Sequence, residues 1–267
     1  MTEIIKITPG DLLALDPTAS GFAHGFGLFE TIQLSGGHVV FWEPHWARLK
    51  ASAEALQLEL TCSADAVLQV IRELAAADGL DSALIKLSLV RDAVGSRLFV
   101  YARPAQPVPA VVGLRFDPNC PINERSILAG HKTHNYMENI SLLESARAAD
   151  YYDVLRVNTI GELAETTIGN IFFVIDGALW TPALETGILP GVIRGEIIAL
   201  HPATREARFE AEILERAEAV FMTNSSCGIL PVESIAGEGF EKNYSSARHP
   251  LVLQLQRQLQ AAGHFSL

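Results

Sequence analysis

The strongest constraint on the fold is a set of short segments in which apolar and polar residues alternate with a period of two. The clearest segment runs from Ala83 to Leu89, where every second residue is apolar. Successive side chains of a strand point to opposite faces, so this alternation is typical of a strand with one buried face. Further extended runs at 97–103 and 111–116 are predicted to join it in one sheet. The first part of the chain is therefore predicted to be organised around a sheet.

A hairpin and two helices are predicted before this sheet. Residues 28–34 form a strand candidate that runs into a Ser-Gly-Gly turn and a second apolar run. Pro44 suits the first turn of a helix, because proline is tolerated where the backbone N–H has no helical partner. A second helix is predicted to begin near Ser63, whose hydroxyl can cap it, and to end at Gly79.

The second half also mixes both kinds of element. Strands are predicted at 154–158, 162–166, 170–175 and 178–181, and helices at 135–150, 192–200 and 247–262. Asp176-Gly177 is a strong signal for a hairpin turn. The segment 117–130 has little periodicity, and we place the domain boundary near residue 120. The chain is thus predicted to be α+β, with a smaller N-terminal domain at 1–119 and a larger domain at 120–267.

Charge and cysteine content narrow the class of partner. The 267 residues include 31 acidic and 20 basic side chains, a net charge of -11, which disfavours non-specific nucleic-acid or anionic-membrane binding. The N-terminus lacks a signal-peptide pattern, and no apolar run approaches the roughly 20 residues that span a bilayer. Three scattered cysteines suggest neither a disulfide framework nor a metal site. We expect a cytoplasmic protein in which any anionic ligand meets a local basic pocket.

Lys132 is the first candidate for chemistry. It lies between His131 and Thr133, close to His134, where the irregular segment meets a predicted helix. Burial and neighbouring cations can lower the pKa of a lysine, and the neutral amine can then form a Schiff base. An isolated lysine in such a place is more often an exposed loop residue, and both interpretations stay open.

Three further segments place polar groups at the end of a strand or at the start of a helix. Glu165 closes one predicted strand and Asn170 begins the next, so the carboxylate could face a ligand or lie in solvent. Val192 and Ile193 open a helix directly after Pro190-Gly191, and the backbone N–H groups at such a terminus bind phosphate well. Ser225 lies in a Thr-Asn-Ser-Ser segment that could hold phosphate or only cap a turn.

Taken together, these segments resemble the class IV aminotransferase family, the fold-type IV enzymes that use pyridoxal 5'-phosphate. The resemblance covers nearly the whole chain. It is carried by the segments 25–31, 45–49, 132–136, 165–172, 181–182, 187–194 and 221–232. It implies a two-domain fold-type IV enzyme.

The resemblance also implies roles for individual residues. Lys132 resembles the lysine that binds the cofactor aldehyde and shuttles protons, and Glu165 resembles the partner of the pyridine nitrogen. The remaining cofactor contacts that it implies come from Arg48, Tyr136, Val192, Ile193 and Ser225. One arginine, one helix terminus and one hydroxyl would let an acidic protein retain a dianionic cofactor.

Two chemistries are found in this family. Aminodeoxychorismate lyases eliminate pyruvate to give 4-aminobenzoate for folate synthesis, whereas branched-chain and D-amino-acid transaminases release a keto acid. Asn135, Asn224, Ile193 and Thr31 resemble the lyases, with Thr31 expected to assist protonation of the departing product and Asn224 to contact the substrate. The lyase is the first prediction, transamination the second, and a catalytically inactive binding module the third.

The substrate carboxylate is expected to meet an arginine. Residues 91–97 resemble the arginine loop of the family, although Asp92 replaces a glycine and the spacing is one residue longer. Arg97 is the predicted ligand, with Arg91 as the alternative. The family resemblance further implies a homodimer.

Overall fold

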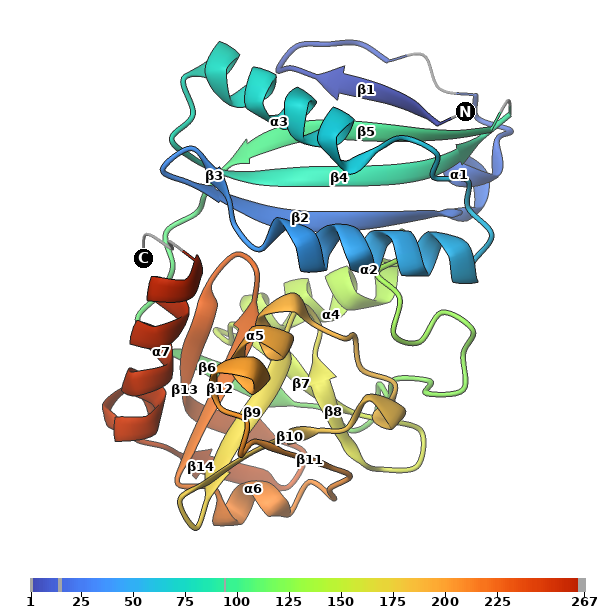
Figure 1. Ribbon diagram of the computed structural model, residues 1–267. Coiled ribbons are helices and arrows are strands. Elements are labelled where there is room, and N and C mark those ends of the chain that lie inside the picture. Colours follow the sequence, from blue (N-terminus) through green and yellow to red (C-terminus); the bar gives the residue numbers. More distant parts are fainter. Residues whose placement is uncertain (1, 14–15, 94, 264–267) are drawn as a thin grey trace. The chain divides into compact units, whose positions relative to one another are not determined.

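The computed structural model describes residues 2–13, 16–93 and 95–263, and the chain divides into two compact units (Figure 1). The first unit contains the residues up to Gln106 together with His131–Tyr136. The second contains Pro107–Gly130 and Met137–Ala262. A six-residue piece between two stretches of the second unit therefore belongs to the first unit.

The first unit is built on a five-stranded sheet with the strand order β1-β5-β4-β2-β3. Its strands are β1 (Glu3–Ile7), β2 (Gly27–Ser35), β3 (His38–Val39), β4 (Ser82–Asp92) and β5 (Gly95–Pro104). Helices α2 (Trp42–Ala55) and α3 (Ala64–Asp78) cover one face, and the short α1 (Ser20–His24) precedes β2 (Figure 1). Ala83, Ile85, Leu87 and Leu89 of β4 all lie in the core of this unit, which confirms the alternation predicted for residues 83–89.

Local signals set the helix ends in this unit. The Ser63 hydroxyl accepts a hydrogen bond from the Ala66 N–H at 3.2 Å, and Gly79 ends α3 in the left-handed conformation at a φ of 61°. Both features were predicted, because a hydroxyl satisfies an unpaired N–H and glycine adopts a positive φ without steric cost. The α2 helix begins at Trp42, so Pro44 lies in its first turn, as predicted.

The second unit contains a nine-stranded curled sheet with the order β11-β10-β9-β12-β13-β6-β7-β8, and β14 pairs with β13. Its strands are β6 (Val112–Phe116), β7 (Asp153–Val157), β8 (Leu163–Thr166), β9 (Asn170–Ile175), β10 (Ala178–Pro182), β11 (Arg205–Ala207), β12 (Ala219–Asn224), β13 (Gly228–Gly237) and β14 (Phe240–Asn243). Its helices are α4 (Met137–Ala148), α5 (Val192–Leu200), α6 (Ile213–Arg216) and α7 (Pro250–Gly263), with 3-10 turns η1 (Leu184–Thr186) and η2 (Ser246–Arg248). Asp176 and Gly177 both have positive φ values in the β9–β10 turn, as the hairpin prediction requires.

The prediction for residues 111–116 was wrong in its choice of sheet. These residues form β6, which pairs in parallel with β13 and β7 of the second unit and not with β5. Local alternation shows that a strand has a buried face, but not which core it faces. The chain consequently passes into the second unit at residues 106 and 107, whereas the sequence placed the boundary near residue 120.

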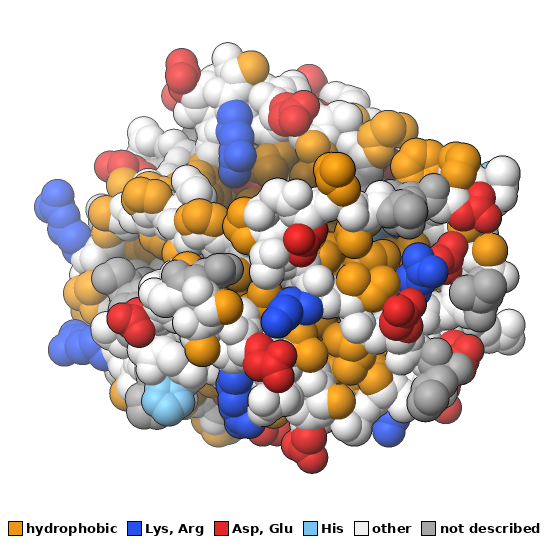
Figure 2. Space-filling model, turned by 90° about the horizontal axis from the view of Figure 1, so that it is seen from above, with side chains coloured by type: hydrophobic (Ala, Val, Ile, Leu, Met, Phe, Trp, Pro, Cys, Tyr) orange, Lys and Arg blue, Asp and Glu red, His pale blue; other side chains and the backbone are white. Residues whose placement is uncertain are grey.

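Two further observations concern the helices and the surface. None of the helices in the described ranges combines the length and apolar character needed to cross a membrane. Figure 2 shows one face of the molecule, on which basic and acidic side chains lie interspersed among apolar ones. Interspersed charges of both signs are typical of a folded surface, on which a large field of one sign is avoided.

Candidate active site

Lys132 is fixed by the sheet of the first unit. The Phe29 N–H donates to the Lys132 carbonyl at 2.9 Å, and the His134 N–H donates to the Gly27 carbonyl at 2.9 Å. The segment His131–Tyr136 therefore lies along β2 and forms one isolated antiparallel bridge with it, between Leu28 and Thr133, so the main chain of Lys132 is held by β2. Because residues that pair across an antiparallel ladder share a face, the Lys132 side chain lies on the same side of the sheet as Phe29.

Two aromatic rings surround the amine of Lys132. Its Nζ lies 4.5 Å from the ring centroid of Phe29 and 5.3 Å from that of Tyr136. The two rings meet edge to face with their centroids 5.2 Å apart. A ring face attracts a cation and leaves few positions for water, so these rings direct the amine and exclude solvent from one side of it.

The histidines beside Lys132 have structural roles. His131 Nδ1 is hydrogen-bonded to the Ser52 hydroxyl at 2.9 Å, and His134 Nε2 to the Ser88 hydroxyl at 2.9 Å. Burial lowers the pKa of both imidazoles below the usual value for histidine. Both rings are therefore neutral at pH 7 and hold the segment in place, so they do not supply the neighbouring cations that the sequence suggested for Lys132.

A second lysine, which the sequence interpretation missed, lies on the same ring. Lys86 Nζ is 4.4 Å from the Phe29 centroid and donates to the Thr31 hydroxyl at 2.6 Å. Burial lowers the pKa of Lys86 to about 8, and the Arg103 charge adds to this effect while the Glu30 charge opposes it. Thr31 and Lys86 are direct partners in the β2–β4 ladder, so the contact depends on strand register.

Arg48 forms a buried cluster with two other side chains. Its Nε and Nη2 donate to the two oxygens of Glu30 at 2.8 Å and 2.6 Å, and His45 Nδ1 lies 2.7 Å from the same carboxylate. Burial alone would raise the pKa of Glu30, but the charge and hydrogen bonds of Arg48, with the hydrogen bond of His45, hold that pKa at about 2. Burial lowers the pKa of His45 in spite of Glu30, so the ring is neutral at pH 7 and donates to the carboxylate. The bidentate contact fixes the plane of the guanidinium.

In the second unit Glu165 is held by two donors. Its Oε2 accepts from Asn170 Nδ2 at 2.8 Å and its Oε1 accepts from the Leu189 N–H at 3.1 Å. The same Asn170 nitrogen also donates to the Leu189 carbonyl at 2.9 Å. Asn170 is thus neither a simple turn residue nor an exposed amide, because its side chain ties the end of β8 to the segment before α5.

The N-terminus of α5 lies directly beside Asn170. Gly191 is the N-cap residue and has no side chain to cap the helix, which begins with Val192 and Ile193. A Cβ at position 191 would be only 1.9 Å from Asn170 Oδ1. The first N–H groups of a helix have no carbonyl partner within it, and with the helix dipole they form an anion-binding site.

The segment after β12 is a turn held by Asn224. Its side-chain oxygen accepts hydrogen bonds from the backbone N–H groups of Ser226 and Cys227 at 2.9 Å and 3.0 Å. Within the part of the chain that the structure describes, the buried Thr223 hydroxyl has no hydrogen-bond partner. Because Thr223 pairs with Asn170 across β9 and β12, a polar ligand near the Glu165 cluster would find an unused hydroxyl there. Asn224 itself shapes the turn that contains Ser225.

Arg97, the predicted ligand of the substrate carboxylate, already has acidic partners. Its Nη1 lies 2.9 Å from Asp92 and its Nε lies 3.2 Å from Glu3. Arg97 and Glu3 are partners in the parallel β1–β5 ladder, a pairing that the sequence did not predict. Two carboxylates neutralise the guanidinium, so this geometry favours a structural role for Arg97.

The alternative, Arg91, is also engaged within the first unit. Its Nη2 donates to the Gln57 carbonyl at 2.6 Å, and its guanidinium lies 3.7 Å from the ring centroid of Phe26. Residue 94 of the predicted arginine loop lies outside the described residues. The arginine loop is thus tied to its own unit by both of its arginines.

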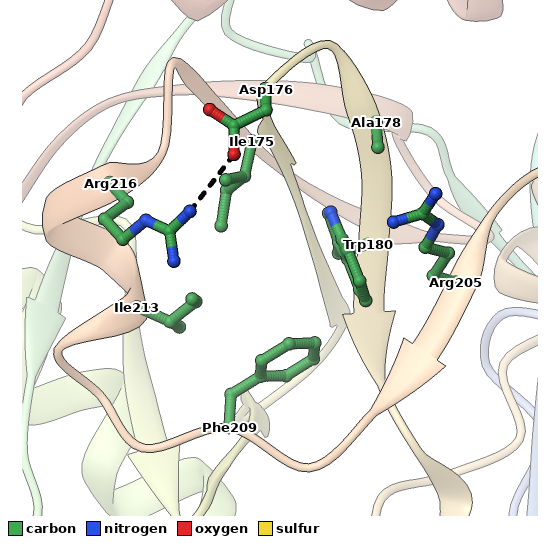
Figure 3. Close-up of a pocket in the computed structure, with 8 residues that line it drawn as sticks. All are labelled: Ile175, Asp176, Ala178, Trp180, Arg205, Phe209, Ile213 and Arg216. Atoms are coloured by element: carbon green, nitrogen blue, oxygen red, sulfur yellow. Dashed lines mark hydrogen bonds and ion pairs between the residues drawn. The ribbon is translucent and has the colours of Figure 1, made fainter.

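A pocket of about 230 Å³ in the second unit is separate from the predicted site residues (Figure 3). It is lined by Ile175, Asp176, Ala178, Trp180, Arg205, Phe209, Ile213 and Arg216. Arg216 pairs with Asp176 at 3.1 Å, and Arg205 lies 4.9 Å from the Trp180 ring centroid. Both arginines on its rim therefore already have partners, and the pocket contains none of the predicted site residues.

The predicted site residues form two sets, one on each unit. In the first unit Lys132 and Tyr136 lie against Phe29, Thr31 is bonded to Lys86 over the same ring, and Arg48 is paired with Glu30. The second set consists of Glu165, Val192, Ile193, Asn224 and Ser225. Four residues of these sets were not predicted as site residues. They are Lys86, Glu30 and His45 of the first unit and Asn170, which donates a hydrogen bond to Glu165.

Comparison with known proteins identifies the family. The model of the class IV amino-transferase family matches residues 27–235. The aminodeoxychorismate lyase of Bacillus subtilis is 26% identical, over 94% of this chain and 91% of that protein. The branched-chain-amino-acid aminotransferase of Salmonella typhimurium is 28% identical, over 80% of this chain and 77% of that protein.

Solved structures agree with the predicted fold. A crystal structure from Legionella pneumophila, of a protein given provisionally as a 4-amino-4-deoxychorismate lyase, superposes with a TM-score of 0.88 at 27% identity. The superposition covers 98% of this chain and 100% of the Legionella chain. The predicted fold-type IV architecture and the predicted enzyme class are confirmed. The chain belongs to the class IV aminotransferase family, whose members are pyridoxal-phosphate-dependent enzymes.

Proposed function

We propose that this chain binds pyridoxal 5'-phosphate covalently through Lys132 and acts as a 4-amino-4-deoxychorismate lyase. The observation that supports the lyase most directly is the likeness to the Bacillus subtilis lyase over nearly the full length of both proteins. The Legionella structure extends the likeness to the complete fold.

Each unit, taken by itself, has groups whose chemistry suits one part of the cofactor. The α5 N-terminus and the Thr223 hydroxyl offer neutral donors suited to phosphate oxygens, and Arg48 offers a guanidinium whose plane Glu30 fixes. Glu165 offers a carboxylate oriented by Asn170 and Leu189, suited to a protonated ring nitrogen. In this proposal Arg48, Val192, Ile193 and Ser225 hold the phosphate, Tyr136 lies against the ring and Glu165 binds its nitrogen.

Lys132 moves the protons. Pyridoxal phosphate, when bound, supplies a conjugated ring that accepts the electrons released at the carbon bearing the substrate amino group. The Lys132 amine removes the proton from that carbon, and its position over two aromatic rings keeps water from competing for the proton. The Glu165 carboxylate stabilises the positive charge on the ring nitrogen and so raises the electron demand of the ring.

The lyase outcome requires a bond to oxygen to break. Once Lys132 had taken the proton from the carbon bearing nitrogen, the bond from the neighbouring ring carbon to the ether oxygen would break as a double bond formed between the two carbons. Enolpyruvate would leave and take up a proton to become pyruvate. Thr31 is suited to donate in this step, because its oxygen already accepts from Lys86 and its own O–H is therefore directed to another acceptor. Asn224 is proposed to contact the substrate from the turn that it shapes.

Product identity tests the proposal. The protein loaded with pyridoxal phosphate is incubated with aminodeoxychorismate and, separately, with L- and D-amino acids plus 2-oxoglutarate. Pyruvate formed together with 4-aminobenzoate supports the lyase. Amino-group transfer without elimination rejects it in favour of a transaminase, the alternative supported by the likeness to the Salmonella enzyme.

We also propose that the enzyme is a cytoplasmic homodimer, as the family resemblance implies. Sedimentation equilibrium of the loaded protein gives the mass directly, to be compared with 29.0 kDa for one chain. A mass of one chain across the micromolar range would exclude the dimer.

A further inference from the structure

Asp153 is a carboxylate buried inside the second unit, at the start of β7. Its exposed fraction is 0%, and across the ranges that the structure describes no lysine, arginine or histidine forms an ion pair with it. Burial raises the pKa of Asp153 above its ordinary value, while hydrogen bonds from Thr167 oppose the rise. A buried carboxylate without a counter-ion costs folding free energy unless donors satisfy it, so the donors of Asp153 identify its role.

Most of these donors come from the turn between β8 and β9. Asp153 Oδ1 accepts from the Thr167 N–H at 3.2 Å and from the Thr167 hydroxyl, and Oδ2 accepts from the Ile168 N–H at 3.3 Å. The Val154 N–H of β7 donates to Oδ1 at 2.7 Å and so fixes that oxygen. Asp153 therefore holds the turn through two main-chain groups and one side chain.

The sheet leaves these two N–H groups without a strand partner. β7 and β8 are antiparallel with Leu155 opposite Thr166, so Asp153 lies level with Ile168, beyond the end of β8 (Figure 1). Buried main-chain N–H groups need an acceptor, and here a side chain takes the place of a neighbouring strand. Removing the Asp153 carboxylate would consequently release the turn.

The turn joins the two residues of the Glu165 cluster. Glu165 lies in β8, Asn170 begins β9, and residues 167–169 connect the two strands. Glu165 Oε2 accepts from Asn170 Nδ2 at 2.8 Å, in a hydrogen bond that spans the turn. The turn also packs closely on β12, since a Cβ at Gly169 would lie 2.7 Å from the Thr223 carbonyl oxygen. A rearranged turn would therefore move Asn170 relative to Glu165.

We propose that Asp153 is a positioning residue for Glu165. From the start of β7 it fixes the turn at 167–169, and with the turn the direction in which Glu165 presents its carboxylate to the ring nitrogen of pyridoxal phosphate. Asp153 itself does not touch the cofactor in this proposal. The inference rests on the proposed function, because it assumes that Glu165 meets the ring nitrogen.

Two cofactors that differ only at the ring nitrogen test the assignment. Fluorescence titration of the apoprotein gives the Kd for pyridoxal phosphate and for its 1-deaza analogue, in which C–H replaces the nitrogen. The wild type should prefer pyridoxal phosphate by about tenfold or more, because the C–H offers Glu165 neither a hydrogen bond nor a positive charge. Glu165→Leu, which removes the carboxylate, should lose the preference.

Asp153→Asn should reduce this preference to about twofold and leave the Kd for the deaza analogue within about threefold of the wild-type value. The amide nitrogen of asparagine cannot accept, so at least one N–H of the turn would face a donor. Asp150→Asn is the matched control, because it makes the same substitution at an exposed position just before β7. The φ of 62° at residue 150 suits asparagine, so this variant should behave as the wild type.

Two variants of Thr167 test the same contact from the other side. Thr167→Val removes the hydroxyl that Asp153 accepts from and should reduce the preference, whereas Thr167→Ser keeps the hydroxyl and should retain it. If Asp153→Asn fails to fold, the two Thr167 variants decide alone. Equal losses of affinity for both cofactors in Asp153→Asn and Thr167→Val would show a merely structural role and overturn the inference.

A double variant tests whether Asp153 acts through Glu165. In the Glu165→Leu background, Asp153→Asn should not change the ratio of the two Kd values further. No preference in the wild type would refute the proposed role of Glu165, and this inference with it. A preference that survives in both Asp153→Asn and Thr167→Val would refute this inference alone.

Discussion

Gly191 and Asn170 are packed so closely that a methyl group at position 191 would lie 1.9 Å from Asn170 Oδ1. The Asn170 amide in turn donates to the Glu165 carboxylate and to the Leu189 carbonyl. The absence of a side chain at the N-cap of α5 therefore keeps Glu165 oriented as well as leaving the helix terminus accessible.

Gly191→Ala is expected to weaken cofactor binding. The backbone at Gly191 has a φ of -63°, which alanine adopts easily, so the cost lies in displacing the Asn170 side chain. Losing its hydrogen bond to a charged carboxylate costs about 1.5–3 kcal/mol, equivalent to roughly a tenfold or larger rise in the Kd for pyridoxal phosphate. Fluorescence titration of the apoprotein measures this Kd.

Gly195→Ala, on the next turn of the same helix, is the matched control. A Cβ there meets nothing within 4 Å, so this variant should leave the Kd unchanged and stabilise the helix by about 0.5–1 kcal/mol. Equal effects of the two substitutions would show that the Asn170 contact is unimportant.

Glu30→Gln is expected to destabilise the protein strongly. The substitution leaves the Arg48 guanidinium without its bidentate carboxylate, and breaking a buried pair typically costs about 3–5 kcal/mol. Urea unfolding followed by circular dichroism measures the change. Glu54→Gln, at an exposed position of the same helix as Arg48, should change the unfolding free energy by no more than about 0.5 kcal/mol. A loss below 1 kcal/mol for Glu30→Gln would contradict a stabilising role for the cluster.

The Glu30 carboxylate should also make the free energy of unfolding depend on pH. The pKa of Glu30 is about 2 in the folded protein against 4.5 for the ordinary side chain, so its contribution is complete above pH 4.5 and is lost as the pH falls towards 2. The difference in urea midpoint between the wild type and Glu30→Gln should accordingly be constant from pH 7 to pH 5 and shrink below pH 4. A difference that grows in acid would mean that the cluster is not an ion pair.

Lys132→Ala should abolish covalent attachment of the cofactor. The protein is incubated with pyridoxal phosphate, reduced with borohydride and digested, and the labelled peptide is identified by mass spectrometry. The wild type should carry the label at Lys132, and the variant should carry none and turn over at least 10³-fold more slowly. Lys86→Met is the control, because it removes the other amine on the Phe29 ring and should leave the label in place. A label on Lys86 in the wild type would reverse the roles of the two lysines.

Much of the local structure could be predicted because its causes are local. The cap at Ser63, the glycine stop at Gly79 and the turn at Asp176 each depend on a few neighbouring residues, and all three are confirmed. The candidate residues were found through motifs in which the order of the segments carried the information, and the family is confirmed by the match over residues 27–235.

The features that were missed depend on pairing between distant segments. The alternation at 111–116 is the same whether β6 joins one sheet or the other, and its partners β7 and β13 lie far along the chain. The contact between Lys86 and Thr31 needs the exact register of β2 against β4. The ion pair of Arg97 with Glu3 needs the parallel strand β1, which was not predicted.

Because of the segment that carries Lys132, neither unit of this enzyme is one continuous stretch of chain. The segment lies along β2, yet residues of the other unit precede and follow it directly. A fragment ending at residue 106 would lack both Lys132, the proposed reactive amine, and the hydrogen bonds that residues 132 and 134 make with β2. A chimera between relatives of this protein should therefore exchange residues 131–136 together with the N-terminal piece. A single crossover point would place β2 of one relative against the Lys132 segment of the other.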